Sequence, residues 1–225
     1  SNIIYFKSFG DFMKTYPSIG GPASGHKKPM TAFFKYDGSN IRVEFDRKKG
    51  FCKFGTKKNM FDETSEWFGP AIPLFHEMWG EKLESLIRKD KHLKTFQKIT
   101  FFFEYFGEKS FAGWHDVADP KTLVLFDVNP LKKGFMCPKE FLDYFGHFEN
   151  IAEVVYEGNY NEPFVKSIMQ NDPPLISKLA IKQPIPEGVV CKGGEKHNLW
   201  ACKVKTAIWK EELKKRHPED WEELM

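Results

Sequence analysis

Apolar and polar side chains alternate along residues 41–46, the period of two that is typical of a strand with one buried face. Lys49-Gly50 follows as a turn, and residues 51–54 are predicted to form the returning strand of a hairpin. Together with the apolar residues from Met30 onward, this gives a strand, turn, strand pattern over residues 30–54. Other runs rich in β-branched and aromatic residues predict further strands, the last two joined by a Gly/His/Asn turn: 99–107, 122–128, 187–192 and 199–206.

A different spacing indicates the helices. Apolar residues recur every three or four positions in residues 63–93, which predicts two helices divided at Pro70 and Pro73. Residues 3–16 are predicted to form a strand or a short helix, and residues 17–28 a Gly/Pro/Ser loop. Shorter helices are predicted at 138–144, at 163–170, and from 207 up to Pro218. Antiparallel hairpins with separate helices predict an α+β fold.

The composition fits one domain of ordinary soluble character. The chain has 225 residues, of which 41% are hydrophobic and 16% aromatic. No apolar run approaches the roughly 20 residues that a membrane span needs, so we expect a cytoplasmic protein. We also expect a monomer. The net charge of +3 is too small to identify a nucleic-acid partner. Basic clusters either form a phosphate-binding surface or are scattered solvated side chains: 27–28, 47–49, 57–58, 132–133 and 214–216.

The chain offers little support for a zinc site, a disulfide or a phosphate loop of the Walker type. Neither a C-x-x-C pair nor an H-E-x-x-H motif occurs in the sequence. Gly20 and Gly25 have the spacing of a Walker glycine loop, but His26-Lys27 stands where Lys and Ser/Thr are required. We therefore expect four free cysteines and no zinc: Cys52, Cys137, Cys191 and Cys202.

Lys35 is the first candidate for chemistry. It follows Phe33-Phe34 in an apolar strand, where a lysine needs either a partner or a function. A lysine amine attacks phosphorus only when it is unprotonated, and burial or neighbouring cations lower its pKa towards that state. Asp37, two positions on, is expected on the same face of the strand, and Gly38 would let the backbone turn closely beneath a nucleotide. A solvated lysine before a β-turn is the simpler alternative for these four residues alone.

Other short stretches follow Lys35 in a fixed order, and together they resemble the motifs of the covalent nucleotidyltransferases. That superfamily comprises ATP-dependent RNA and DNA ligases and mRNA capping enzymes. The resemblance covers residues 35–205, and five motifs in order are far more specific than any one of them. The matching stretches are Lys35-Tyr36-Asp37-Gly38, Phe103-Glu104-Tyr105-Phe106-Gly107, Leu125-Phe126-Asp127, Glu187-Gly188-Val189-Val190 and Lys203-Val204-Lys205.

The resemblance implies a nucleotidyltransferase (ATP-grasp-like) domain of antiparallel sheets flanked by helices. It would cover residues 3–217, with 218–225 as a tail and no oligonucleotide-binding barrel. The implied activity is that of an ATP-dependent RNA ligase acting in RNA repair. Such an enzyme joins 3′-hydroxyl and 5′-phosphate RNA ends through a covalent lysine–AMP intermediate, with ATP and Mg²⁺ or Mn²⁺ as cofactors.

The resemblance also implies the site residues. Lys35, Lys203 and Lys205 would be catalytic, and Glu187 and Glu104 would hold the metal. Two lysines on one strand face repel each other unless an anion lies between them, and they would also lower the pKa of Lys35. The nucleotide-binding residues would be Asp37, Gly38, Asn40, Lys57, Glu104, Phe126, Glu187, Lys203 and Lys205.

Two positions bear on the choice within the superfamily. Asn40 stands where DNA ligases and capping enzymes more typically carry an arginine, which favours an RNA ligase. Lys57 or Lys58 stands where many relatives carry a phosphate-binding arginine, so the contact there would be a point charge. A DNA ligase, a capping-type enzyme and a non-catalytic nucleotide-binding module are the alternatives.

Overall fold

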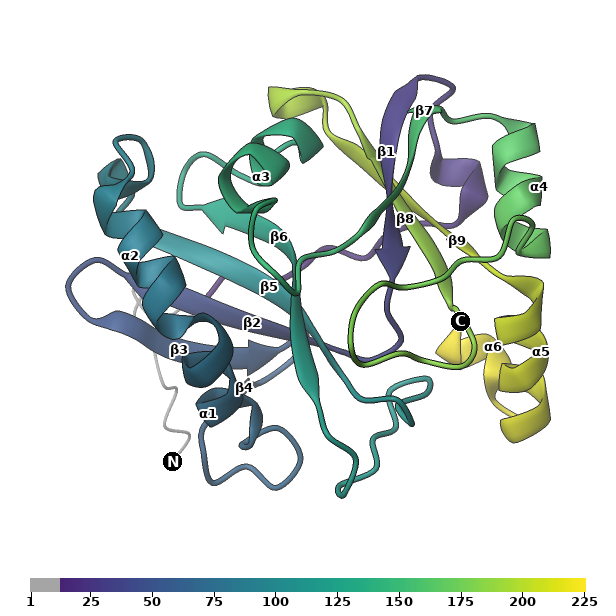
Figure 1. The fold of residues 1–225 in the computed structure, drawn as a ribbon, viewed down its shortest axis with the longest axis horizontal. Helices are drawn as coiled ribbons and strands as arrows, with labels where there is room; N and C mark the ends of the chain where they lie inside the picture. Colours follow the sequence, from purple (N-terminus) through teal and green to yellow (C-terminus); the bar gives the residue numbers. More distant parts are fainter. Residues whose placement is uncertain (1–12) are drawn as a thin grey trace, which may run out of the picture.

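A computed structural model describes residues 13–225 of the chain, and two antiparallel sheets form its body (Figure 1). The first sheet has the strand order β4-β3-β2-β5-β6 and the second the order β7-β1-β8-β9. The first sheet contains β2 (Ser39–Asp46), β3 (Gly50–Thr56), β4 (Met60–Phe61), β5 (Lys98–Phe106) and β6 (Thr122–Pro130). The second contains β1 (Pro29–Lys35), β7 (Val154–Asn159), β8 (Gly188–Gly193) and β9 (Trp200–Lys205). The predicted α+β class with antiparallel sheets is confirmed.

Helices flank both sheets. Figure 1 shows α1 and α2 against the first sheet, and α4 and α5 beyond the second. The α-helices are α1 (Ala71–Phe75), α2 (Glu81–Lys89), α3 (Pro138–Phe145), α4 (Glu162–Gln170), α5 (Ala207–Arg216) and α6 (Trp221–Leu224). A π-helical segment, His76–Gly80, joins α1 to α2, and single 3-10 turns occupy Pro22–Ser24, Leu93–Thr95 and Lys196–Asn198. Within residues 13–225, no helix is long and apolar enough to cross a bilayer.

The aromatic content of the sequence forms the core between the first sheet and its helices. Residues 101–103 of β5 are each 0% exposed, so the continuous phenylalanine run belongs to a strand covered on both faces. Trp79 and Leu83 pack into the same cluster from the helical side. A second cluster lies between α4 and strands β8 and β9, and a small third one gathers Phe111, Trp209 and Leu213.

The strand register determines where polar side chains meet. Lys35, the last residue of β1, pairs with Gly188 on β8, which in turn pairs with Lys205 on β9. On the other sheet, Asn40 of β2 pairs with Glu104 of β5. Because residues 36–38 carry the chain from β1 directly into β2, these two rows lie where the sheets meet.

Most predicted strands and the helices at 138–144 and 163–170 are confirmed within one or two residues. The helix predicted from residue 63 is wrong at its start, because residues 63–70 form turns and Pro70 caps α1. Pro73 does not divide two helices either; it lies in the first turn of α1, where a proline has no hydrogen bond to lose. Most of the element predicted at 3–16 falls outside the described residues, and residues 13–16 form neither a strand nor a helix. The segment predicted as a tail contains α6.

Candidate nucleotide-binding site

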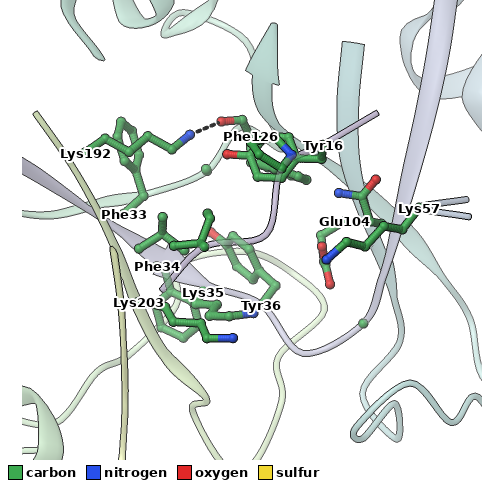
Figure 2. Close-up of a pocket in the computed structure, with 16 residues that line it drawn as sticks. Tyr16, Phe33, Phe34, Lys35, Tyr36, Lys57, Glu104, Phe126, Lys192 and Lys203 are labelled. Carbon is green, nitrogen blue, oxygen red and sulfur yellow. Dashed lines mark hydrogen bonds between the residues drawn. The ribbon is translucent and has the colours of Figure 1, made fainter. Parts of the chain in front are cut away.

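A cavity of about 260 Å³ opens where the two sheets meet, and Figure 2 shows the side chains around it. Most of the residues predicted from the sequence line this cavity: Lys35, Gly38, Asn40, Lys57, Glu104, Phe126 and Lys203. Lys58, the alternative to Lys57, does not line it. Residues that lie 168 positions apart in the sequence, Lys35 and Lys203, therefore face one space, as the five ordered motifs predict.

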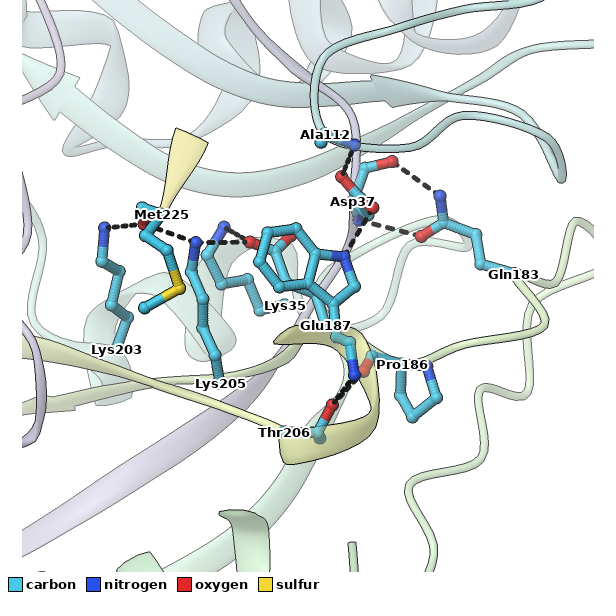
Figure 3. A network of polar contacts seen from close by, with 11 residues as sticks. Lys35, Asp37, Ala112, Gln183, Pro186, Glu187, Lys203, Lys205, Thr206 and Met225 are labelled. Atoms are coloured by element: carbon cyan, nitrogen blue, oxygen red, sulfur yellow. Dashed lines mark hydrogen bonds and ion pairs between the residues drawn. The ribbon is translucent and has the colours of Figure 1, made fainter. Parts of the chain in front are cut away.

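At one end of the cavity Lys35 and Lys203 line the space, whereas Glu187 and Lys205 do not line it and join Lys35 through ion pairs. These four residues are here called the phosphate end. Glu187 Oε1 lies 3.2 Å from the Nζ atoms of both Lys35 and Lys205, so two ammonium groups share one carboxylate oxygen (Figure 3). The backbone oxygen of Met225 accepts hydrogen bonds from Lys205 at 2.6 Å and from Lys203 at 3.3 Å. Several donors thus converge here on oxygen atoms of the chain itself, in the way that they would converge on a phosphate.

The protonation state of Lys35 differs from the expectation. Burial lowers its pKa, but Glu187 and Glu104 together outweigh burial and hold the pKa above its usual value. The prediction that Lys35 has a lowered pKa is therefore wrong. Burial instead lowers the pKa of Lys205 to about 8, although Glu187 acts in the opposite direction.

Glu104 and Asn40 form the wall of the cavity on the first sheet. Burial raises the pKa of the Glu104 carboxyl to about 8, even though Lys35 pulls it down. The side-chain oxygen of Asn40 is buried and has no hydrogen-bond partner among residues 13–225. A buried amide oxygen left unpaired is uncommon in proteins. The wall therefore offers one acceptor and one carboxyl group to a ligand, a pattern suited to hydroxyl groups.

The opposite end of the cavity, here called the base end, is formed by Phe126, Lys192, Asp127 and Tyr16. Lys192 Nζ donates to the Phe126 backbone oxygen at 2.8 Å and to Asp127 Oδ2 at 2.9 Å. The Tyr16 hydroxyl donates to the same Asp127 oxygen at 2.8 Å, and its ring meets Phe126 edge-on with centroids 5.0 Å apart. Phe126 is thus held by a paired, largely buried network. The sequence pattern indicates no role for Lys192, Asp127 or Tyr16.

Asp37 has a different position from the one expected. Its Oδ2 accepts from the Trp209 indole at 2.8 Å and its Oδ1 from the Ala112 backbone at 2.9 Å. The side chain of Gln183 bonds both the N–H and the C=O of Asp37 (Figure 3). Burial and Glu187 raise the pKa of Asp37 to about 7. Asp37 does not line the cavity, and the geometry shows it holding the turn that follows Lys35.

At two positions in the predicted motifs, the backbone lies so close to a neighbouring strand that only glycine fits. A Cβ atom on Gly38 would lie 2.3 Å from the Tyr105 backbone oxygen. On Gly188, whose φ is +150°, it would lie 2.0 Å from the Val204 backbone oxygen. Gly38 therefore lets β2 begin against β5, and Gly188 lets β8 approach β9 beside Lys205. Both allow the backbone to pack closely around the site, and Gly38 also lines the cavity.

Comparison with solved structures finds the same fold in an RNA ligase of Naegleria gruberi. The Naegleria gruberi RNA ligase with PPi has a TM-score of 0.62 and 16% identity over 92% of this chain. A variant of that ligase with ATP and Mn has a TM-score of 0.61 and 14% identity over 91%. The first match covers 60% of the ligase chain and the second 59%, so this chain spans less than two thirds of the ligase.

The chain thus shares its fold with the matched part of the Naegleria gruberi RNA ligase. No protein-family model matches it, and no curated protein matches its sequence. At identities of 12–16%, what the comparison establishes is the fold.

Proposed function

We propose that the chain is the adenylyltransferase domain, residues 3–217, of an ATP-dependent RNA ligase. It would join 3′-hydroxyl and 5′-phosphate RNA ends through a lysine–AMP intermediate on Lys35. The single observation that carries this proposal is the row Lys35, Gly188, Lys205, which sets the candidate nucleophile beside Glu187 at the end of a cavity of suitable chemistry. The shared fold and the order of the motifs support the same conclusion.

In the first step, the unprotonated Lys35 amine attacks the α-phosphorus of ATP. An N–P bond forms, the P–O bond to pyrophosphate breaks, and the amine proton leaves. A 5′-phosphate oxygen then takes the AMP from Lys35, and a 3′-hydroxyl displaces AMP to form the phosphodiester. Lys203 and Lys205 would bind the phosphates that leave in the first step. Each step depends mainly on positioning and on neutralising charge.

Within the proposal, the remaining residues bind the nucleoside. Phe126 would stack on the base, and stacking tolerates any base because every base has a π face. Asn40 and Glu104 face the ribose, and the unpaired Asn40 oxygen is suited to a hydroxyl donor. Lys57, whose Nζ lies 3.2 Å from Ser18 Oγ, would supply a further positive charge. Asp37 and Gly38 shape the turn after Lys35 and act through it.

The donor set fits a divalent cation that is held mainly by nucleotide phosphates. No group of three or more His, Cys, Asp or Glu side chains able to hold a metal ion occurs among residues 13–225. Mg²⁺ in nucleotide enzymes commonly takes one or two protein carboxylates and completes its shell with phosphates and water. Glu187 and Glu104 would be those carboxylates. When bound, the cation would neutralise phosphate charge.

The test is an intact-protein mass spectrum after incubation with ATP and Mg²⁺. The protein is first treated with pyrophosphate, which removes AMP already bound. We expect a gain of one adenylyl group in the parent and in Lys166→Ala, an exposed lysine of α4, but none in Lys35→Ala. No gain in the parent would overturn the proposal and leave a nucleotide-binding module.

A substrate panel then separates the ligase from its relatives. Nicked RNA and nicked DNA duplexes, and single-stranded RNA, are offered with ATP or with GTP. The proposal expects sealed RNA ends with ATP. Sealed DNA alone would indicate a DNA ligase, and covalent GMP would indicate capping chemistry.

A further inference from the structure

The residue that caps α5 is bound directly to the segment that carries Glu187, just before β8. The Thr206 hydroxyl donates to the Pro186 backbone oxygen at 2.7 Å, and the Thr206 N–H donates to the Glu187 backbone oxygen at 2.9 Å. The same hydroxyl accepts a hydrogen bond from the backbone N–H of Trp209 at 3.2 Å and so caps the helix. α5 therefore begins at a fixed place relative to the phosphate end, and Trp209, 1% exposed, lies one turn into it.

Trp209 contacts both halves of the proposed reaction centre. Its indole N–H donates to Asp37 Oδ2 at 2.8 Å, a buried contact across 172 positions of sequence. Its ring face lies 4.4 Å from the Lys205 ammonium, within the range of a cation–π contact. The Trp209 side chain thus connects Asp37, in the turn that follows β1, with Lys205 on β9. Figure 3 shows Asp37, Lys205 and the start of α5 at Thr206 gathered in this way.

Each contact adds one restraint to a group that already has other partners. Lys205 has a long side chain, and its ammonium bonds Glu187 at 3.2 Å and the Met225 backbone oxygen at 2.6 Å. The ring face of Trp209 restricts the ammonium from a third side. Asp37 has its backbone held by Gln183, so the indole N–H and the Ala112 N–H orient the remaining side chain. Loss of the indole N–H would leave a buried carboxylate oxygen without its partner.

We propose that Trp209 is a positioning residue for adenylyl transfer, which holds Lys35 and Lys205 in their mutual geometry through Asp37 and through its own ring. The inference rests on the proposed function. Reacting atoms must approach within about 3–3.5 Å in line, and a displacement of about 1 Å can cost about a hundredfold in rate. Because Trp209 does not line the cavity, its loss should leave ATP binding nearly unchanged.

The alternative is that Trp209 only fills a small core with Phe111 and Leu213. Two substitutions separate the possibilities. Trp209→Phe keeps an aromatic face for Lys205 and removes the N–H, whereas Trp209→Leu removes both contacts. Trp79→Phe is the matched control, because Trp79 is 0% exposed and its indole also donates one buried hydrogen bond, to the Leu123 backbone oxygen at 3.0 Å. Trp79 lies in the main core, where its ring contacts Phe103, Phe148 and the Lys82 ammonium.

Single-turnover formation of the lysine–AMP adduct is measured across ATP concentrations. We expect the maximal rate to fall about tenfold in Trp209→Phe and about a hundredfold in Trp209→Leu, with the Kd for ATP within about twofold of the parent. Trp79→Phe should lose thermal stability but keep the maximal rate. Equal rates in Trp209→Phe and Trp79→Phe, or a weaker Kd with an unchanged rate, would overturn the proposal. If Trp209→Leu does not fold, Trp209→Phe decides.

A second measurement does not depend on catalysis. Inorganic pyrophosphate is titrated into the protein while tryptophan fluorescence is followed. We expect a change in emission in the parent that is absent in Trp209→Phe and in Lys205→Met, because the Lys205 ammonium shifts against the ring when it binds the anion. If the parent forms no adduct but shows this signal, the proposed ligase activity is contradicted and the contact between Trp209 and Lys205 is supported. A parent that forms the adduct without this signal would contradict the role of Trp209 alone.

Discussion

At the base end of the cavity, Lys192, Asp127 and Tyr16 already satisfy one another, whereas at the phosphate end Lys35 and Lys205 share the one oxygen of Glu187. The first arrangement is complete without a ligand and keeps Phe126 in place. The second has more donors than local carboxylates, so an anion would relieve the repulsion between its lysines. We therefore expect the base end to contribute mainly to the stability of the fold and the phosphate end mainly to the reaction.

The largest effect is expected at the phosphate end. Lys205→Met should lower the rate of adduct formation by at least about a hundredfold, about 2.7 kcal/mol, because it removes a charge that stabilises departing pyrophosphate. Rapid-quench measurement of the adduct checks this, with Lys166→Met as the control. A rate within threefold of the parent would show that Lys205 is a structural partner of Glu187 only.

At the base end the effect should appear in stability. Lys192 and Asp127 side chains are 12% and 7% exposed, so Lys192→Met leaves a buried carboxylate that keeps the Tyr16 hydroxyl and the Val128 N–H but loses its cation. We expect a loss of about 3 kcal/mol in the free energy of unfolding. The double variant Lys192→Met with Asp127→Asn should recover part of it. Urea denaturation checks both, and a loss below 1 kcal/mol would contradict a stabilising pair.

A nucleotide-binding experiment separates the two ends further. Phe126→Leu should weaken ATP binding about tenfold, close to the 1–3 kcal/mol that stacking on an aromatic ring contributes. Pyrophosphate binding should stay unchanged, since it involves only the phosphate end. Calorimetric titration in a Lys35→Ala background, which blocks turnover, measures both ligands. Equal weakening of both ligands would mean that the ends are not independent.

The smallest effect concerns the loop behind the turn that follows Lys35. His115 bonds Ser39 Oγ at 2.7 Å through Nε2 and Ser110 Oγ at 2.8 Å through Nδ1. Burial, then Lys121, lowers its pKa to about 4, although Asp119 raises it. The unfolded chain therefore binds a proton more readily, and stability is lost as the pH falls from about 6.5 towards 4, by at most about 1.4 kcal/mol for each pH unit.

His115→Asn should flatten this part of the pH profile, and the exposed His92→Asn should not. Urea midpoints at a series of pH values measure the difference between each variant and the parent. Each variant must be compared with the parent, because two other groups change stability in the opposite direction. The pKa values of Asp37 and Glu104 are raised to about 7 and about 8, so the stability that their carboxyl groups contribute is lost as the pH rises. An unchanged slope in His115→Asn would contradict a neutral, buried imidazole.

Local pattern predicted the frame of the molecule and much of the cavity. Alternation identified β2, the apolar run identified β5, and the ordered motifs brought Lys35, Glu104, Phe126 and Lys203 together. These features are local: a strand needs only its own period, and each motif needs only its own few residues. The pairing of Lys35, Gly188 and Lys205 then follows from strand register.

The rest depends on contacts between distant segments. Trp209 belongs to a charged helix whose sequence carries no sign of its bond to Asp37, and Gln183 lies in a loop without periodicity. The raised pKa of Lys35 depends on how near Glu187 lies, which only the folded chain determines. Pro70 and Pro73 show the same limit, because only the packing of α1 determines whether a proline begins a helix or interrupts one.

Peptide mapping of the adenylated protein tests the central claim most directly. The protein is incubated with ATP and Mg²⁺ and digested, and the peptide that carries AMP is identified by tandem mass spectrometry. The account predicts AMP on Lys35, in the parent and, more slowly, in Lys205→Met. AMP on Lys203, Lys205 or Lys57, or no adenylated peptide from protein first treated with pyrophosphate, would contradict it.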